Sequence, residues 1–115
     1  MPEHLVAITT LGDSEQAVHL ARALLEMRLV ACVNIVPGVR SLYRWKGEIA
    51  DDGEQILVMK TRADRYRELE AAVSELHPYD CPELIAFRVE KGAPSYLSWI
   101  DDCLNSDPDF DDRNG

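Results

Sequence analysis

The sequence lacks the segments that would take a chain into or across a membrane. No apolar run approaches the roughly 20 residues of a membrane-spanning helix. Residues 1–4 lack the basic region that begins a secretory signal peptide. The cysteines, Cys32, Cys81 and Cys103, are odd in number and form no Cys-x-x-Cys pair, which indicates reduced thiols rather than a disulfide framework. These absences predict a cytoplasmic protein with no membrane partner.

Common catalytic motifs and positive charge are also scarce. The chain has no G-x-S-x-G, no P-loop and no G-x-G-x-x-G, which argues against the common hydrolase, phosphate-binding and dinucleotide-binding classes. Only 12 Lys and Arg stand against 21 Asp and Glu, for a net charge of −9. Because nucleic acids are bound by basic surfaces, this balance argues against a nucleic-acid partner. We predict no catalytic residue and no enzyme activity.

The negative charge is concentrated at the C-terminal end. Residues 101–115 hold six Asp and one Arg, which together account for more than half of the net charge. A polar, acidic segment with few apolar residues cannot build a core of its own. We therefore expect one folded domain over residues 1–104, followed by an acidic, disordered tail over residues 105–115.

Apolar periodicity predicts four strands and three helices. The segment after residue 30 is long and alternating, and Pro37-Gly38 interrupts it as a bulge or bend. Residues 46–53 are polar and are predicted to be the turn that follows this segment. The predicted strands cover residues 5–10, 30–46, 54–62 and 83–89, and the predicted helices begin at Asp13 or Ser14, at Asp64 and at Pro94.

The order of these elements predicts an α+β fold of the ferredoxin-like βαββαβ class. Right-handed crossovers place both long helices on one face of a four-stranded antiparallel sheet, with a short C-terminal helix added. The second and third strands form a hairpin that is long for so small a domain. Its edges invite pairing with another chain.

Lys60 is a charged residue in an otherwise apolar strand pattern, in register with Ile56 and Val58. One interpretation is a lysine near a strand end whose ammonium group reaches water. The other is a contact to an anionic ligand in a cleft, with Tyr43, Trp45 and Glu83 nearby. The sequence leaves both interpretations open.

Candidate metal ligands and nucleophiles are few. His77 and Cys81 are four residues apart, but prolines at positions 78 and 82 interrupt the helix that would align them. His77 is therefore either a structural residue at a helix end or a ligand. Cys32 lies in an apolar run and is either a small buried side chain or a nucleophile, which would need a base such as His77.

Three segments in order closely resemble the CutA family of divalent-cation tolerance proteins. They are ACVNIVPGVRSLYRWKG at residues 31–47, HPYDCPEL at 77–84 and YLSWI at 96–100. The resemblance extends over about residues 4–103. It implies a ferredoxin-like fold and a homotrimer in which the long hairpins pair across subunits. It also implies a role in tolerance of copper or another divalent cation, and it brings no established reaction.

The resemblance also implies a cleft between subunits, at Cys32, Tyr43, Trp45, Lys60, His77, Tyr79 and Glu83. Some relatives carry a cysteine on the first strand and two adjacent histidines before the Pro-Tyr, and these are linked to copper. Here the corresponding residues are Thr9, Leu76 and His77. We therefore expect His77 and Cys32 as metal ligands. The alternatives are a trimeric sensor similar to PII proteins that binds an anionic small molecule, a scaffold for a partner, and an enzyme with Cys32 as nucleophile.

Overall fold

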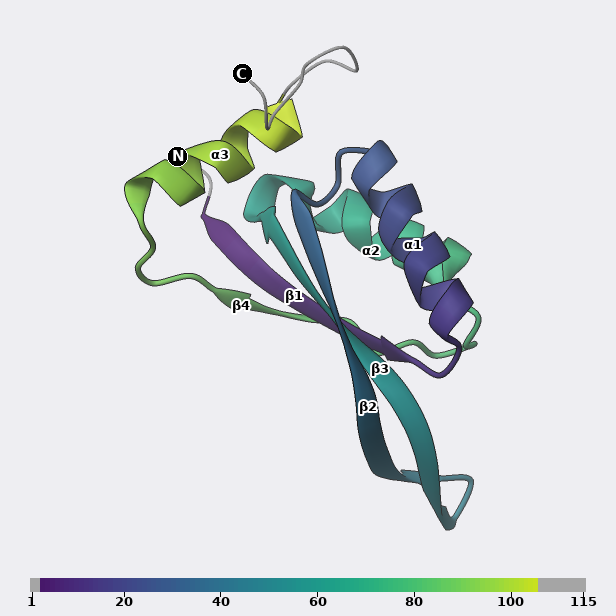
Figure 1. Cartoon of the computed structure of the whole chain (residues 1–115). Coiled ribbons are helices and arrows are strands. Elements are labelled where there is room, and N and C mark those ends of the chain that lie inside the picture. Colours follow the sequence, from purple (N-terminus) through teal and green to yellow (C-terminus); the bar gives the residue numbers. More distant parts are fainter. Residues whose placement is uncertain (1–2, 106–115) are drawn as a thin grey trace.

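The computed structural model describes residues 3–105 and has the predicted order of elements (Figure 1). The four strands form one antiparallel sheet in the order β2-β3-β1-β4. This arrangement confirms the predicted α+β fold. The elements are β1 (His4–Leu11), α1 (Ser14–Glu26), β2 (Cys32–Trp45), β3 (Glu48–Arg62), the 3-10 helix η1 (Ala63–Arg65), α2 (Tyr66–Leu76), β4 (Ile85–Arg88) and α3 (Pro94–Asn105).

The helices α1 and α2 lie on one face of the sheet, and the β2–β3 hairpin extends beyond the helical layer (Figure 1). Alternate strand residues on the covered face, including Ala7, Leu57 and Met59, are completely buried. They pack against apolar helix residues such as Leu20, Leu24 and Leu69. Side chains alternate across a strand, so the intervening residues lie on the opposite face, which neither α1 nor α2 covers.

The hairpin is longer at its tip than the sequence predicted. Residues 46–53 were expected to form a turn, and this is wrong, because β3 begins at Glu48 and pairs with β2 as far as Trp45. The turn consists of Lys46 and Gly47, whose φ angles are 50° and 81°. Positive φ at both positions matches the right-handed twist of the flanking strands, so pairing continues to the last residue. Residues 48–53 are therefore strand, and all of them except Ala50 are exposed.

The predicted bulge at Pro37-Gly38 is confirmed. The β2–β3 register shifts between Val36 and Val39, and Gly38 has a φ of 75°. Proline has no N–H to give to the ladder, and glycine tolerates the left-handed backbone, so the two residues interrupt the pairing together.

Helix starts were predicted with mixed success. Asp13 is the N-cap of α1, because its Oδ1 accepts hydrogen bonds from the backbone N–H groups of Glu15 and Gln16. The second helix was expected to open at Asp64. Instead η1 occupies this position and α2 begins at Tyr66.

Within residues 3–105, no helix is both long and apolar enough to cross a membrane.

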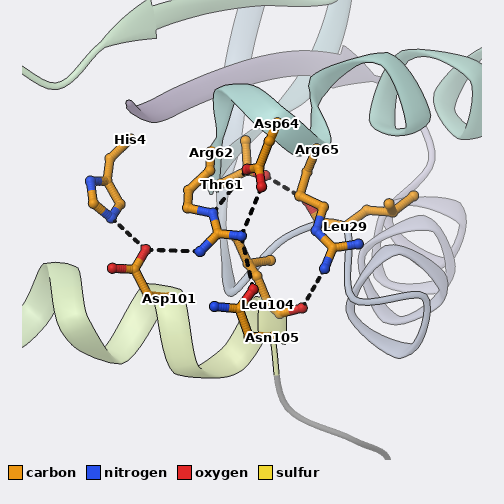
Figure 2. Close-up of polar contacts among 9 residues, drawn as sticks. All are labelled: His4, Leu29, Thr61, Arg62, Asp64, Arg65, Asp101, Leu104 and Asn105. Atoms are coloured by element: carbon orange, nitrogen blue, oxygen red, sulfur yellow. Dashed lines mark hydrogen bonds and ion pairs between the residues drawn. The ribbon is translucent and has the colours of Figure 1, made fainter. Parts of the chain in front are cut away.

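The last helix, α3, is joined to the sheet by polar contacts around Arg62 (Figure 2). The guanidinium donates to Asp64, to Asp101 and to the side-chain oxygen of Asn105, while His4 contacts Asp101 at 2.9 Å. Asn105 is therefore part of the folded body, one residue beyond the predicted boundary. Residues 106–115 of the predicted tail lie outside the described residues.

Candidate functional site

A cleft of about 870 Å³ lies between the outer half of the β2–β3 hairpin, which carries the turn, and the segment that precedes β4. We call it the hairpin cleft. The hairpin contributes Tyr43, Trp45, Asp52 and Glu54, together with Arg40, Ser41 and Leu42. The other side is formed by Thr10 of β1 and by Pro78, Tyr79, Asp80, Cys81 and Glu83.

Two phenol–carboxylate hydrogen bonds order the interior of the cleft. Tyr79 donates its hydroxyl to Oε2 of Glu54 at 2.8 Å, and Tyr43 donates to Oδ2 of Asp52 at 2.5 Å. Partial burial and the bond to Glu54 raise the pKa of Tyr79 to about 12. The hydrogen bond to Asp52 likewise raises the pKa of Tyr43. Both phenols therefore remain protonated donors at neutral pH.

The charge of the lining is strongly negative. Asp52, Glu54, Asp80 and Glu83 supply four carboxyl groups against one guanidinium, that of Arg40. That guanidinium already forms two hydrogen bonds, of 2.9 and 2.6 Å, with Asp51, which is not part of the lining. The cleft therefore concentrates negative potential next to the exposed ring of Trp45.

His77 lies behind the cleft and holds one of its walls. The side chain is buried, and its Nε2 donates to the backbone oxygen of Thr10 at 2.8 Å. Its Nδ1 accepts the backbone N–H of Tyr79 at 3.1 Å, and the two rings meet edge to face. Both ring nitrogens are thus engaged in hydrogen bonds: the Nε2 bond joins the segment after α2 to β1, and the Nδ1 bond lies within that segment.

Lys60 and Cys32 face each other elsewhere in the β2–β3 ladder. The lysine Nζ lies 3.9 Å from the cysteine Sγ and also donates to the side-chain oxygen of Asn34. Neither Lys60 nor Cys32 lines the hairpin cleft. Of the residues that the resemblance implies, the fold brings together Tyr43, Trp45, Tyr79 and Glu83, with His77 behind them.

The expected metal ligands do not meet within one chain. Cys32 pairs with Lys60 of β3. His77 bonds to Thr10, which pairs with Ile56, and Ile56 is four residues from Lys60 along β3. At about 3.3 Å per residue, these positions are roughly 13 Å apart, and two ligands at about 2.0–2.3 Å from one ion cannot span that distance. Among residues 3–105, no group of three or more His, Cys, Asp or Glu is arranged to hold a metal ion. The residues of a single chain therefore do not fit an ion at His77 and Cys32.

Two important cleft residues, Asp52 and Glu54, were missed by sequence reasoning. Asp52 lay in the segment expected to be a turn, and Glu54 was placed at the very start of the return strand. The alternation of Glu54 with Ile56, Val58 and Lys60 was the available signal, because side chains two residues apart share one face of a strand.

A second surface feature is the sheet face opposite α1 and α2. Several of its side chains, those of β1 and β4 in particular, are apolar but not fully buried. Ile85 and Phe87 are 47% and 55% exposed, and their strand partners Ile8 and Val6 are only partly buried. A bare apolar sheet face is typical of a surface that another protein chain covers.

Comparison with known proteins gives one consistent family. The family described as "CutA1 divalent ion tolerance protein" matches residues 5–103. The chain is 44% identical over 95 residues to the divalent-cation tolerance protein CutA of Thermus thermophilus, and the match covers 83% of this chain and 92% of that protein. It is 42% identical over 94 residues to Protein CutA of Mus musculus, covering 82% of this chain but only 53% of that longer protein.

Solved structures of the same family resemble this chain closely. The CutA structure from Xylella fastidiosa superposes with a TM-score of 0.87 at 37% identity, covering 90% of this chain and 99% of that one. The names of relatives point to different compartments, since one from Arabidopsis thaliana is named chloroplastic and one from Archaeoglobus fulgidus is named periplasmic. Similarity alone therefore does not assign a compartment to this chain, and the cytoplasm stays a prediction.

Proposed function

The chain belongs to the CutA1 divalent ion tolerance family, and from this membership we propose that it acts as a homotrimer in the response to copper or another divalent cation. The relatives are named for tolerance of divalent cations and not for a reaction, so the proposal contains no catalytic step. We also propose that it works in the cytoplasm.

The observation that carries the homotrimer is the bare sheet face. Val6, Ile8, Ile85 and Phe87 would leave a contiguous apolar surface in contact with water if the chain stayed alone. Covering such a surface stabilises an assembly by about 25 cal/mol per Å² of apolar area removed from water. A second copy with the same face supplies a matching apolar partner.

The hairpin supports the same proposal. The described part of the chain measures 49 × 29 × 24 Å, and the hairpin projects beyond the helical layer (Figure 1). Near its tip Leu42 and Ile49 are 63% and 64% exposed. Large apolar side chains on a projecting pair of strands favour contact with a neighbouring subunit.

Direct binding of a metal would require ligands from more than one subunit. His77 and Cys32 remain the proposed ligands, but within one chain they lie apart, and Lys60 places a positive charge beside Cys32. A site shared between copies would therefore have to displace a hydrogen bond of His77 and keep the ammonium group away from the ion.

Sedimentation and calorimetry test this proposal. We expect the full-length chain to sediment at three times its mass of 13.0 kDa. Copper titrated into the full chain, and into a variant ending at residue 105, should bind at about one ion per chain and more weakly in His77→Ala. His19→Ala, on the exposed face of α1, is the matched control. A monomer would contradict the assembly, and equal copper binding by the two histidine variants would contradict the ligand assignment.

A second candidate function is that of a small-molecule sensor. The observation that favours it is the hairpin cleft itself, whose volume of about 870 Å³ suits an organic ligand. The lining does not favour the anionic ligand expected from the sequence, because Lys60 lies outside the cleft and carboxylates dominate within it.

A further inference from the structure

Glu54 is the unusual residue of the hairpin cleft. Only 8% of its surface is exposed, yet within residues 3–105 no Lys, Arg or His side chain forms an ion pair with it. Among the described residues, its carboxylate has one hydrogen-bond partner, the phenol of Tyr79, which donates to Oε2. A buried carboxylate without a counter-charge is costly, since a single neutral donor replaces little of the lost hydration. A cation arriving in the cleft would supply the missing charge.

Aromatic rings line the same cleft and are suited to the same kind of ligand. Trp45 is half exposed, and Tyr43 and Tyr79 are also partly open to the cleft. The indole of Trp45 already has the ammonium group of Lys46 5.9 Å from its ring centroid. Ammonium groups are attracted to the faces of aromatic rings, and methylene chains pack well against them.

We propose that the hairpin cleft binds a linear organic polyamine, whose ammonium groups pair with Glu54, Asp52 and Asp80 while its methylene chain packs against Trp45. The inference deepens the sensor candidate and does not depend on a metal site. An extended ligand fits better than a bare ion, because the carboxylates are spread around about 870 Å³ and are not gathered into a coordination shell.

Calorimetry with spermidine tests the proposal on the full-length protein. We expect micromolar binding that weakens with added salt, because the attraction is between opposite charges. Glu54→Gln should weaken binding about tenfold, since it removes the buried charge. Glu75→Gln is the matched control, because it makes the same change on an exposed position of α2 and should leave the affinity unchanged.

A second variant keeps the test valid if Glu54→Gln does not fold. Asp80 lies on an exposed loop that lines the cleft, and Asp80→Asn should weaken spermidine binding several-fold. Trp45 fluorescence should change on binding, and this change should be absent in Trp45→Phe.

Three results would overturn the polyamine proposal. One is equal spermidine binding by the Glu54, Asp80 and Glu75 variants, and another is copper binding that depends on Glu54 when spermidine does not bind. The third is a structure of the assembly in which a neighbour's Lys or Arg pairs with Glu54. None of these results bears on the homotrimer, which is tested separately by sedimentation.

Discussion

Tyr79 shows how one side chain joins the two walls of the hairpin cleft. Its backbone N–H binds His77, while its hydroxyl reaches Glu54 on the hairpin. Gly12 lies close by, since a Cβ at this position would be 3.4 Å from the Tyr79 hydroxyl oxygen. The ring therefore occupies a fixed place between β3 and the segment after α2.

The first prediction concerns alkaline pH. The pKa of Tyr79 is raised from 10.0 to about 12 in the folded state, so the unfolded chain loses this proton first. The unfolded state then binds fewer protons, and stability falls as pH rises between 10 and about 12. Urea unfolding at a series of pH values should show this decrease, and Tyr79→Phe should show a smaller one. Identical pH profiles would mean that Tyr79 is not the responsible group.

The second prediction concerns the α1 cap. Asp13→Ala removes the acceptor of two backbone N–H groups and should lower the free energy of unfolding by about 1 kcal/mol. Ser14→Ala, one residue later, changes no such acceptor and is the control. Equal denaturation midpoints for the two variants would contradict the assigned cap.

At the scale of elements, the hairpin depends on its two-residue turn. Gly47 has a φ of 81°, which other residues adopt only at a cost of roughly 1–2 kcal/mol. The third prediction is that Gly47→Ala destabilises the chain by about this amount in chemical denaturation. Gly53→Ala is the matched control, because Gly53 lies in the same strand, has no positive φ and has no atom within 4 Å of the added Cβ. A larger loss for Gly53→Ala would argue against the turn assignment.

The helix α3 depends on Arg62, whose guanidinium joins η1, α3 and the end of β3 (Figure 2). Partial burial opposes ionisation of Asp101, but the hydrogen bonds from Arg62 and His4 dominate and lower its pKa. A lowered carboxyl pKa stabilises the fold above the unfolded value, and this contribution is lost as pH falls below about 3.8. We therefore expect α3 to detach more readily in acid.

The fourth prediction tests this attachment. Arg62→Ala should reduce the free energy of unfolding by about 2–3 kcal/mol, because it removes charged hydrogen bonds to Asp64 and Asp101. Compared with the unsubstituted chain, the Arg62→Ala variant should exchange its backbone amide hydrogens faster in α3, with a smaller change in α1. Arg88→Ala is the control, since its ion pair with Glu3 is exposed. Unchanged exchange in α3 would show that its apolar contacts alone hold it.

At the scale of the whole molecule, the question is what covers the open sheet face. The fifth prediction is that Phe87→Glu converts the proposed homotrimer to smaller species, because it places a charge on this apolar surface. Val18→Glu, on an exposed position of α1, should leave the assembly intact. Sedimentation velocity measures both, and circular dichroism checks that the fold persists. An unchanged assembly in Phe87→Glu would place the interface elsewhere.

The sequence by itself determined the order of elements, and local chemistry explains why. Apolar periodicity predicted the strands and helices, Asp13 or Ser14 predicted the start of α1, and Pro37-Gly38 predicted the bulge or bend. The three family motifs predicted the CutA family and its fold, which the comparisons confirm. These features depend on residues close together in the chain, so the sequence carries them directly.

Only the tertiary structure decided which side chains meet. The tight turn at Lys46-Gly47 extends β3 through Asp52, and the pairing of β3 with β1 brings Glu54 next to Tyr79. The same strand register separates Cys32 from His77. Such contacts depend on the pairing and twist of strands that are distant in the sequence, and a one-residue change of register would turn every side chain to the other face. Periodicity along one segment therefore cannot predict them.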